Sequence, residues 1–184
     1  GRFCAVMGSP EACLAKLLHM FLGLLVDPER DVRADACRGS VELHSAVGHD
    51  AFVEHVVPKL ARCTLDESHV VRNAYAEVCN DIISALYEGN KGASKGGDSV
   101  TDLVTKTFNL MTDDNAEVRT KVMTAVQRLT ERASENRESG LLEDRFLQAL
   151  QEASRDSDWR VRASFTMQLP ALARALGRFL SRRC

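Results

Sequence analysis

The sequence predicts an all-α fold: an α-solenoid in which about four antiparallel helix pairs stack into a superhelix. A short phrase recurs four times, and in each copy an aspartate is followed by valine five residues later and by arginine six residues later. The aspartates stand at positions 27, 66, 113 and 156, which are 39, 47 and 43 residues apart. An internal repeat of roughly 40 residues is typical of stacked helix pairs. Aromatic residues make up only 5% of the chain, which favours helix packing by leucine, valine and alanine.

The first predicted helix pair occupies about residues 9–48. Pro10 is suited to the first position of its first helix, where a backbone N–H would have no partner in any case. Apolar residues then recur at helical spacing until the turn that begins at Asp27. The second helix is predicted from Val32 to Val47, and the glycine that follows ends it.

The second pair occupies about residues 50–88. Pro58 lies inside its first helix and is expected to kink it. The second helix carries apolar residues from Val71 to Leu86. Four glycines and two lysines then fall within residues 89–97, a composition that predicts a flexible insert between repeats.

The third and fourth pairs occupy about residues 98–134 and 140–177, with a polar loop at 134–139 between them. Pro170 falls inside the last helix and is expected to bend it. Counting from the valine of each phrase, apolar or small residues occupy positions 0, 4, 8, 11 and 15 in all four second helices. That spacing places one continuous stripe on each helix, which neighbouring pairs must cover by stacking.

The charged residues of the phrase keep a strict separation, which solvated side chains have no reason to do. We expect each aspartate to accept hydrogen bonds from backbone N–H groups at its turn. We expect each arginine to reach the aspartate of a neighbouring repeat, so that the pairs form a ladder along the stack. The predicted ladder residues are Asp27, Arg33, Asp66, Arg72, Asp113, Arg119, Asp156 and Arg162.

Charge and composition narrow the function classes. The formal net charge is −2, which argues against a general nucleic-acid binder. No apolar run approaches the roughly 18 residues that a membrane span needs, and no secretory signal is visible. Residues 1–184 are predicted to be a single array. Both ends look cut, so we expect it to be part of a longer one.

Neither metal binding nor catalysis is expected. The six cysteines include no C-x-x-C pair, so buried reduced thiols are the expected state. The histidines form no recurring His-Glu set, and the His44 and His49 pair lacks a ligand spacing. No Gly-x-Ser-x-Gly elbow is present to activate a nucleophile. We therefore expect a protein that is not an enzyme and has no cofactor.

Units of about 40 residues with this aspartate, valine and arginine phrase resemble HEAT repeats, and the resemblance covers roughly residues 9–177. Pro58 stands eight residues before Asp66, where the HEAT pattern often has a proline. Two stretches are similar to a narrower family, the scaffolding A subunits of type 2A serine/threonine protein phosphatases. They are residues 109–119, and Asp158-Trp-Arg-Val-Arg followed by Pro170 in the second helix.

That resemblance implies a non-enzymatic scaffold of the cytoplasm or nucleus, which docks a phosphatase catalytic subunit and regulatory subunits along its turns. It implies no membrane or nucleic-acid partner. Carried over by position, the partner-binding residues would be Glu29, Arg30, Glu67, His69, Asn115, Glu117, Asp158, Trp159 and Arg160. Trp159 has two interpretations, an interface anchor or a side chain packed on the adjacent turn. An alternative function is a HEAT-type array for another partner, either tubulin or a nuclear-transport cargo or GTPase.

Overall fold

The computed structural model describes residues 10–89, 97–135 and 144–181, and within these ranges the chain is all-helical, as predicted. Its elements are α2 (Pro10–Leu24), α3 (Arg30–Arg38), α4 (Ser40–Val47), α5 (His49–Ala51), the π-helical turn η1 (Phe52–Val56), α6 (Val57–Cys63), α7 (His69–Gly89), α8 (Gly97–Asn109), the 3-10 turn η2 (Leu110–Thr112), α9 (Ala116–Glu135), α10 (Asp144–Ser154) and α11 (Trp159–Ser181). Residues 90–96 of the predicted insert, and most of the predicted loop at 134–139, lie outside the described residues.

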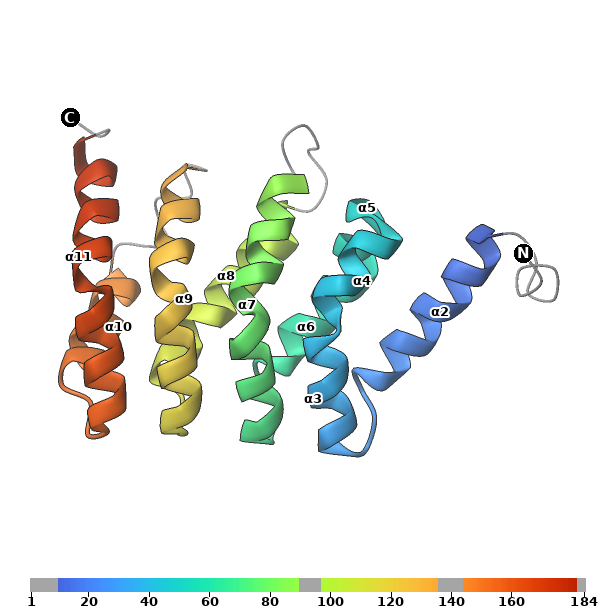
Figure 1. Ribbon diagram of the computed structural model, residues 1–184, viewed down its shortest axis with the longest axis horizontal. Coiled ribbons are helices and arrows are strands. Elements are labelled where there is room, and N and C mark those ends of the chain that lie inside the picture. The colour runs from blue at the N-terminus through green and yellow to red at the C-terminus, as the bar shows by residue number, and fades with distance from the viewer. Residues whose placement is uncertain (1–9, 90–96, 136–143, 182–184) are drawn as a thin grey trace.

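The helices lie in two layers. In one layer α3, α7, α9 and α11 stand side by side in chain order, and α7 packs against both α3 and α9 while α9 packs against α11 (Figure 1). Behind them α6, α8 and α10 form the second layer, each joined by a short turn to the helix in front. At the N-terminal end of the row α2 packs against α3.

The second helix of the first pair was predicted as one continuous helix over 32–47, but the structure has two helices there, α3 and α4. It is divided at Gly39, whose ψ of −5° opens the turn between α3 and α4. Glycine disfavours a helix interior. The hydroxyl of the buried Ser40 also donates to the Cys37 carbonyl at 2.6 Å, an alternative to regular helix bonding. The predicted end of this segment at Gly48 is confirmed, and this glycine has a φ of 82°.

A kink was expected at Pro58, and the structure has a wider, π-helical turn just before this residue. In η1 the Val57 N–H donates to the carbonyl of Phe52, five residues back, as in a π-helix. Proline has no N–H to donate and its ring clashes with the carbonyl four residues earlier, and a wider turn relieves that clash. Pro170 lies inside α11, as predicted, and this helix continues to Ser181.

The apolar stripe of the second helices is largely buried between the layers. In α7 all five predicted positions are buried: Val71, Tyr75, Cys79, Ile82 and Leu86. In α9 the described stripe residues Val118, Val122 and Val126 are buried as well. The prediction is wrong at Leu169 of α11, which is 43% exposed. Among the described elements, α11 packs against α9 and α10, and none lies on its other side (Figure 1).

Cysteine burial agrees with the expectation of structural thiols. Cys37, Cys63 and Cys79 are buried and unbridged, while Cys13 is partly exposed. Over the described ranges, no helix has both the length and the apolarity to cross a membrane.

Candidate functional site

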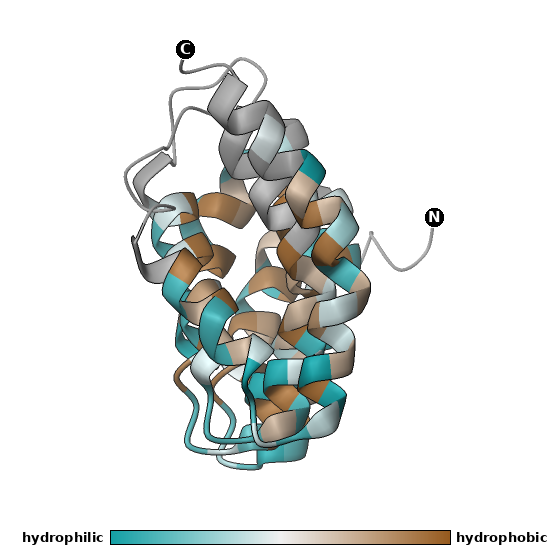
Figure 2. Cartoon of the chain, turned by 90° about the vertical axis from the view of Figure 1, so that its left-hand side faces the viewer, coloured by the Kyte–Doolittle hydropathy of each residue, from teal (hydrophilic) through white to brown (hydrophobic). Residues whose placement is uncertain are grey.

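The candidate site is the edge of the molecule formed by the four turns between paired helices. We call it the turn edge, and its turns span residues 25–29, 64–68, 113–115 and 155–158. The turns lie along one edge of the row, at the bottom of Figure 1, and the end-on view shows them together with mostly hydrophilic residues (Figure 2). Because the second helices stand side by side, one extended partner can contact several turns.

Each phrase aspartate shapes its own turn. Its Oδ1 accepts a hydrogen bond from the backbone N–H two residues later, which closes an Asx turn. The four bonds join Glu29 to Asp27 at 2.8 Å, Ser68 to Asp66 at 2.9 Å, Asn115 to Asp113 at 2.8 Å and Asp158 to Asp156 at 2.8 Å. The turns therefore share one backbone geometry although their sequences differ.

Each phrase arginine is anchored first to its own turn. The Nη1 of Arg119 donates to the carbonyl oxygens of Asp113 at 2.7 Å and Asp114 at 3.2 Å. The other three arginines, Arg33, Arg72 and Arg162, make the same pair of bonds to the carbonyls six and five residues before them. This anchoring holds the guanidinium plane in a fixed direction and leaves Nε and Nη2 pointing along the row.

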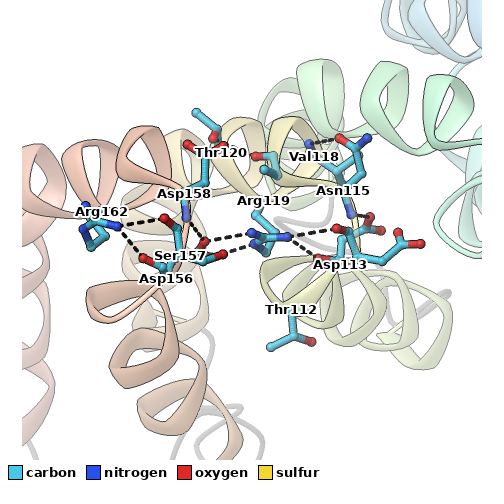
Figure 3. Close-up of polar contacts among 12 residues, drawn as sticks. Thr112, Asp113, Asn115, Val118, Arg119, Thr120, Asp156, Ser157, Asp158 and Arg162 are labelled. Atoms are coloured by element: carbon cyan, nitrogen blue, oxygen red, sulfur yellow. Dashed lines mark hydrogen bonds and ion pairs between the residues drawn. The ribbon is translucent and has the colours of Figure 1, made fainter.

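The remaining guanidinium edge joins neighbouring repeats. Nε and Nη2 of Arg119 donate to the two carboxylate oxygens of Asp156 at 2.6 and 2.7 Å (Figure 3). Arg33 binds Asp66 in the same bidentate way at 2.8 and 2.8 Å, and Arg72 binds Asp113 at 2.7 and 3.0 Å. These three rungs are the ladder that the spacing predicts, and their side chains are only 5–14% exposed.

The rungs stay charged at neutral pH. The hydrogen bond from Arg119 lowers the pKa of Asp156. Burial pushes the pKa of Asp66 upward, but the bonds from Arg33 and from the Ser68 N–H outweigh burial and leave that pKa below its ordinary value. The same balance, with Arg72 as partner, lowers the pKa of Asp113.

The predicted partner-binding residues divide into two groups. Those with exposed side chains are Glu29, Arg30, Glu67, His69, Glu117, Trp159 and Arg160. Asn115 and Asp158 are partly buried because they cap helices: Asn115 Oδ1 accepts from the Glu117 N–H at 2.9 Å, and Asp158 Oδ1 accepts from the Arg160 N–H at 2.8 Å. The family resemblance placed both residues in partner binding, and their capping role was not predicted.

At the fourth turn the edge exposes a large aromatic side chain beside a charged pair. Trp159 is 68% exposed, so its indole is not buried against the adjacent turn. Beside it, the Arg160 guanidinium is held by the Asp158 carboxylate at 2.8 and 3.1 Å. That pairing raises the pKa of Arg160 and lowers the pKa of Asp158 to about 2.

Two grooves lie between neighbouring turns. The first, about 460 Å³, separates the first two turns and is lined by Pro28, Glu29, Arg30, Arg33, Glu67, Ser68 and His69. The second, about 160 Å³, is lined by Glu67, His69, Arg72, Asp114 and Asn115. Their walls are polar and contain both charge signs, which suits a polar peptide segment better than an apolar small molecule.

A second charged link was missed by the sequence reasoning. Glu77 in α7 accepts from Arg38 in α3 and from Lys121 in α9, both at 2.9 Å. The bonds from Lys121 and Arg38 lower the pKa of Glu77. A signal was present, because Arg38 and Glu77 both stand six residues after the phrase valine and carry opposite charges.

His44 in α4 and His49 in α5 lie at the end of the first repeat that is away from the turn edge (Figure 1). The rings of His44 and His49 meet edge to face with centroids 5.8 Å apart, and His44 also meets Phe52 at 5.0 Å. Burial, and then the nearby His49, lower the pKa of His44. Across residues 10–89, 97–135 and 144–181, no group of three or more His, Cys, Asp or Glu side chains is placed to hold a metal ion.

The described chain is thus an all-helical protein whose turns are joined by a bidentate arginine–aspartate ladder. No protein-family model matches the sequence, and a search of curated proteins finds no match.

Proposed function

We propose that this chain is a HEAT-type α-solenoid scaffold, related to the scaffolding A subunits of type 2A serine/threonine protein phosphatases. In this proposal it binds a phosphatase catalytic subunit and regulatory subunits along the turn edge. Three features support the solenoid: the recurring phrase, the two layers of helices in chain order, and a ladder that repeats the same contact from one pair to the next.

One observation supports a binding role above the others. Within each phrase the repeating aspartate and valine are at least partly buried, as are Arg33, Arg72 and Arg119. The side chains between them differ from copy to copy, and the exposed ones include Glu29, Arg30, Glu67, His69, Glu117, Trp159 and Arg160. A stack that needed only stability would have no use for a large apolar side chain there, yet the fourth turn exposes Trp159. Tryptophan and arginine are the residues most enriched among strong interface contacts.

The geometry suits positioning rather than catalysis. The ladder and the Asx turns hold the four turns in one rigid register. Two partners bound to neighbouring turns would therefore be held near one another, which raises the effective concentration of each for the other. In this role the chain contributes orientation, and the bound enzyme contributes the chemistry.

Binding to a purified type 2A catalytic subunit tests the proposal. The immobilised chain is expected to capture the subunit, and Trp159→Ala is expected to weaken capture by about 30-fold, the effect of losing one strong aromatic contact. Met167→Ala is the matched control, because Met167 is an exposed apolar residue of the same helix that lies two turns away from the edge. Helical content should be unchanged in both variants.

Two results would contradict the proposal. Capture that Trp159→Ala leaves intact would remove the turn edge from the interface. Failure to bind the phosphatase, with binding to purified tubulin or to a small GTPase instead, would favour the alternative of a HEAT-type array for another partner.

A further inference from the structure

The two grooves of the turn edge adjoin one another at the second turn. Glu67 and His69 line both grooves, with the first turn opposite them in the larger groove and the third turn opposite them in the smaller one. A described turn bounds each groove on both sides, so neither groove depends on where the row ends (Figure 1). The grooves therefore offer one path across three neighbouring turns.

The ladder arginines that line the grooves are already occupied by the fold. Arg72 makes five hydrogen bonds, to the carboxylates of Asp113 and Asp114 and to two carbonyls of the second turn. A guanidinium has five N–H donors, so Arg72 has none left. Arg33 makes four hydrogen bonds, to the Asp66 carboxylate and to two carbonyls of the first turn. An anion that entered the grooves would find at most one free donor on these two side chains.

The carboxylates of the grooves are free by comparison. Glu29 and Glu67 stand on opposite walls of the larger groove, both are exposed, and across residues 10–89, 97–135 and 144–181 neither carboxylate accepts a hydrogen bond. In the smaller groove the Asp114 carboxylate is 88% exposed and accepts one bond. The exposed cation of the larger groove, Arg30, already lies beside Asp31, with Nε 3.9 Å from Oδ1. Free negative charge thus exceeds free positive charge in both grooves.

A cation of extended shape fits these positions better than a metal ion. Within the described ranges, no three His, Cys, Asp or Glu side chains converge to hold a metal ion. Helices packed side by side lie about 8–10 Å apart, and an extended strand advances about 3.3 Å per residue. Basic side chains three residues apart in one strand would therefore reach successive grooves.

We propose that the two grooves bind an extended peptide segment of a partner protein with basic side chains three residues apart. One basic side chain lies between Glu29 and Glu67, and the next lies between Glu67 and Asp114. Leu65, on the same turn as Glu67 and 69% exposed, gives an apolar side chain of that segment a contact. This inference rests on the binding role proposed above for the turn edge and adds the chemistry of the bound segment.

Fluorescence anisotropy of labelled peptides with the full chain at low salt is the test. The probe is a short peptide of glycine, serine and arginine in which arginine stands at every third position. The control peptide has the same composition with its arginines adjacent. The spaced peptide should bind about fivefold more tightly, because adjacent arginines reach only one groove and each further charge-assisted contact adds affinity. Added salt should weaken its binding, since exposed charges are screened.

Three single variants test which carboxylates take part. Glu67 lines both grooves, so Glu67→Gln should weaken binding of the spaced peptide about fivefold and remove its advantage over the control peptide. Glu29→Gln should have a smaller effect, because Glu29 lines one groove only. Glu42→Gln is the matched control: it makes the same charge change at an exposed residue of α4, away from the turn edge, and should leave binding unchanged (Figure 1). All three side chains are exposed, so helical content should stay constant.

The inference is overturned if the spaced peptide does not bind, if both peptides bind equally, or if Glu67→Gln and Glu42→Gln have equal effects. In the last two cases the chain would respond only to net charge. Capture of the type 2A catalytic subunit by a chain that binds neither peptide would leave the proposed function standing and remove this inference. Binding of the spaced peptide without that capture would support this inference and remove the phosphatase from the proposed function.

Discussion

The Arg119–Asp156 rung can be removed by Arg119→Met, which keeps most of the side-chain volume and deletes the charge. The change deletes four hydrogen bonds, two to the Asp156 carboxylate and two to the carbonyls of Asp113 and Asp114. It leaves a carboxylate that is only 9% exposed without its cation. Breaking such a pair from one side typically costs 3–5 kcal/mol. Asp156 keeps its bond from the Asp158 N–H and water can reach it, so we expect a loss of about 3 kcal/mol.

Urea unfolding followed by circular dichroism at the helix band measures this loss. Lys106→Ala is the control, because Lys106 pairs with Asp102 in an exposed contact of 2.6 Å within one helix. That change should cost about 0.5 kcal/mol or less. The double variant Arg119→Met with Asp156→Asn should cost less than the sum of the two single variants, by about 2 kcal/mol, because each single change already breaks the pair.

The structure also predicts where in the chain Arg119→Met reduces stability. The rung joins the start of α9 to the turn before α11, so amide protection should fall most in α10 and α11 and least in α3. The reasoning is refuted if Arg119→Met and Lys106→Ala destabilise equally. The rung would then be worth no more than an exposed ion pair.

Two other predictions concern the first repeat. Gly48→Ala should destabilise the chain by about 1–3 kcal/mol, because a φ of 82° with ψ of 161° suits only glycine. Gly23→Ala is the control: a Cβ added there meets nothing within 4 Å, so this change should be neutral or stabilising. Equal thermal midpoints for the two variants would contradict this prediction. The lowered pKa of His44 means that the unfolded chain takes up its proton first as the pH falls. The contribution of His44 to stability should therefore be fully present above about pH 6.5 and be lost as the pH falls below it. His44→Gln should flatten that decrease in pH-dependent unfolding, while His69→Gln, at an exposed position, should not.

Much of the ladder could be predicted because both partners of each rung belong to the same repeated phrase. A single pair such as Arg72 and Asp113 lies 41 residues apart and would not be recognisable alone. Four copies at a common spacing imply that whatever contact one copy makes, the next copy makes as well. The helix end at Gly48 was likewise predictable, because glycine acts on the local backbone.

Other features depend on neighbours that the local sequence does not specify. The break at Gly39 is stabilised by the buried hydroxyl of Ser40, and its burial is a property of the packed layers. The link through Glu77 spans three helices, and the charged pair of Arg38 and Glu77 at one offset does not recur in the third and fourth repeats, where Thr124 and Met167 stand. The capping by Asn115 and Asp158 depends on where the following helix starts, and a shift of one residue would have made both ordinary surface residues.

Val126 and Leu169 show most simply which features the sequence determined and which the tertiary structure decided. Each stands eight residues after a phrase valine, and each belongs to the same predicted apolar stripe. The sequence by itself determined that both lie on the stacking side of a helix, because the 3.6-residue period acts within a few turns of the chain. Only the tertiary structure decided that Val126 is 0% exposed and Leu169 is 43% exposed. Burial is shared between two surfaces, and among residues 10–89, 97–135 and 144–181 a further second helix covers that side of α9 but not that side of α11.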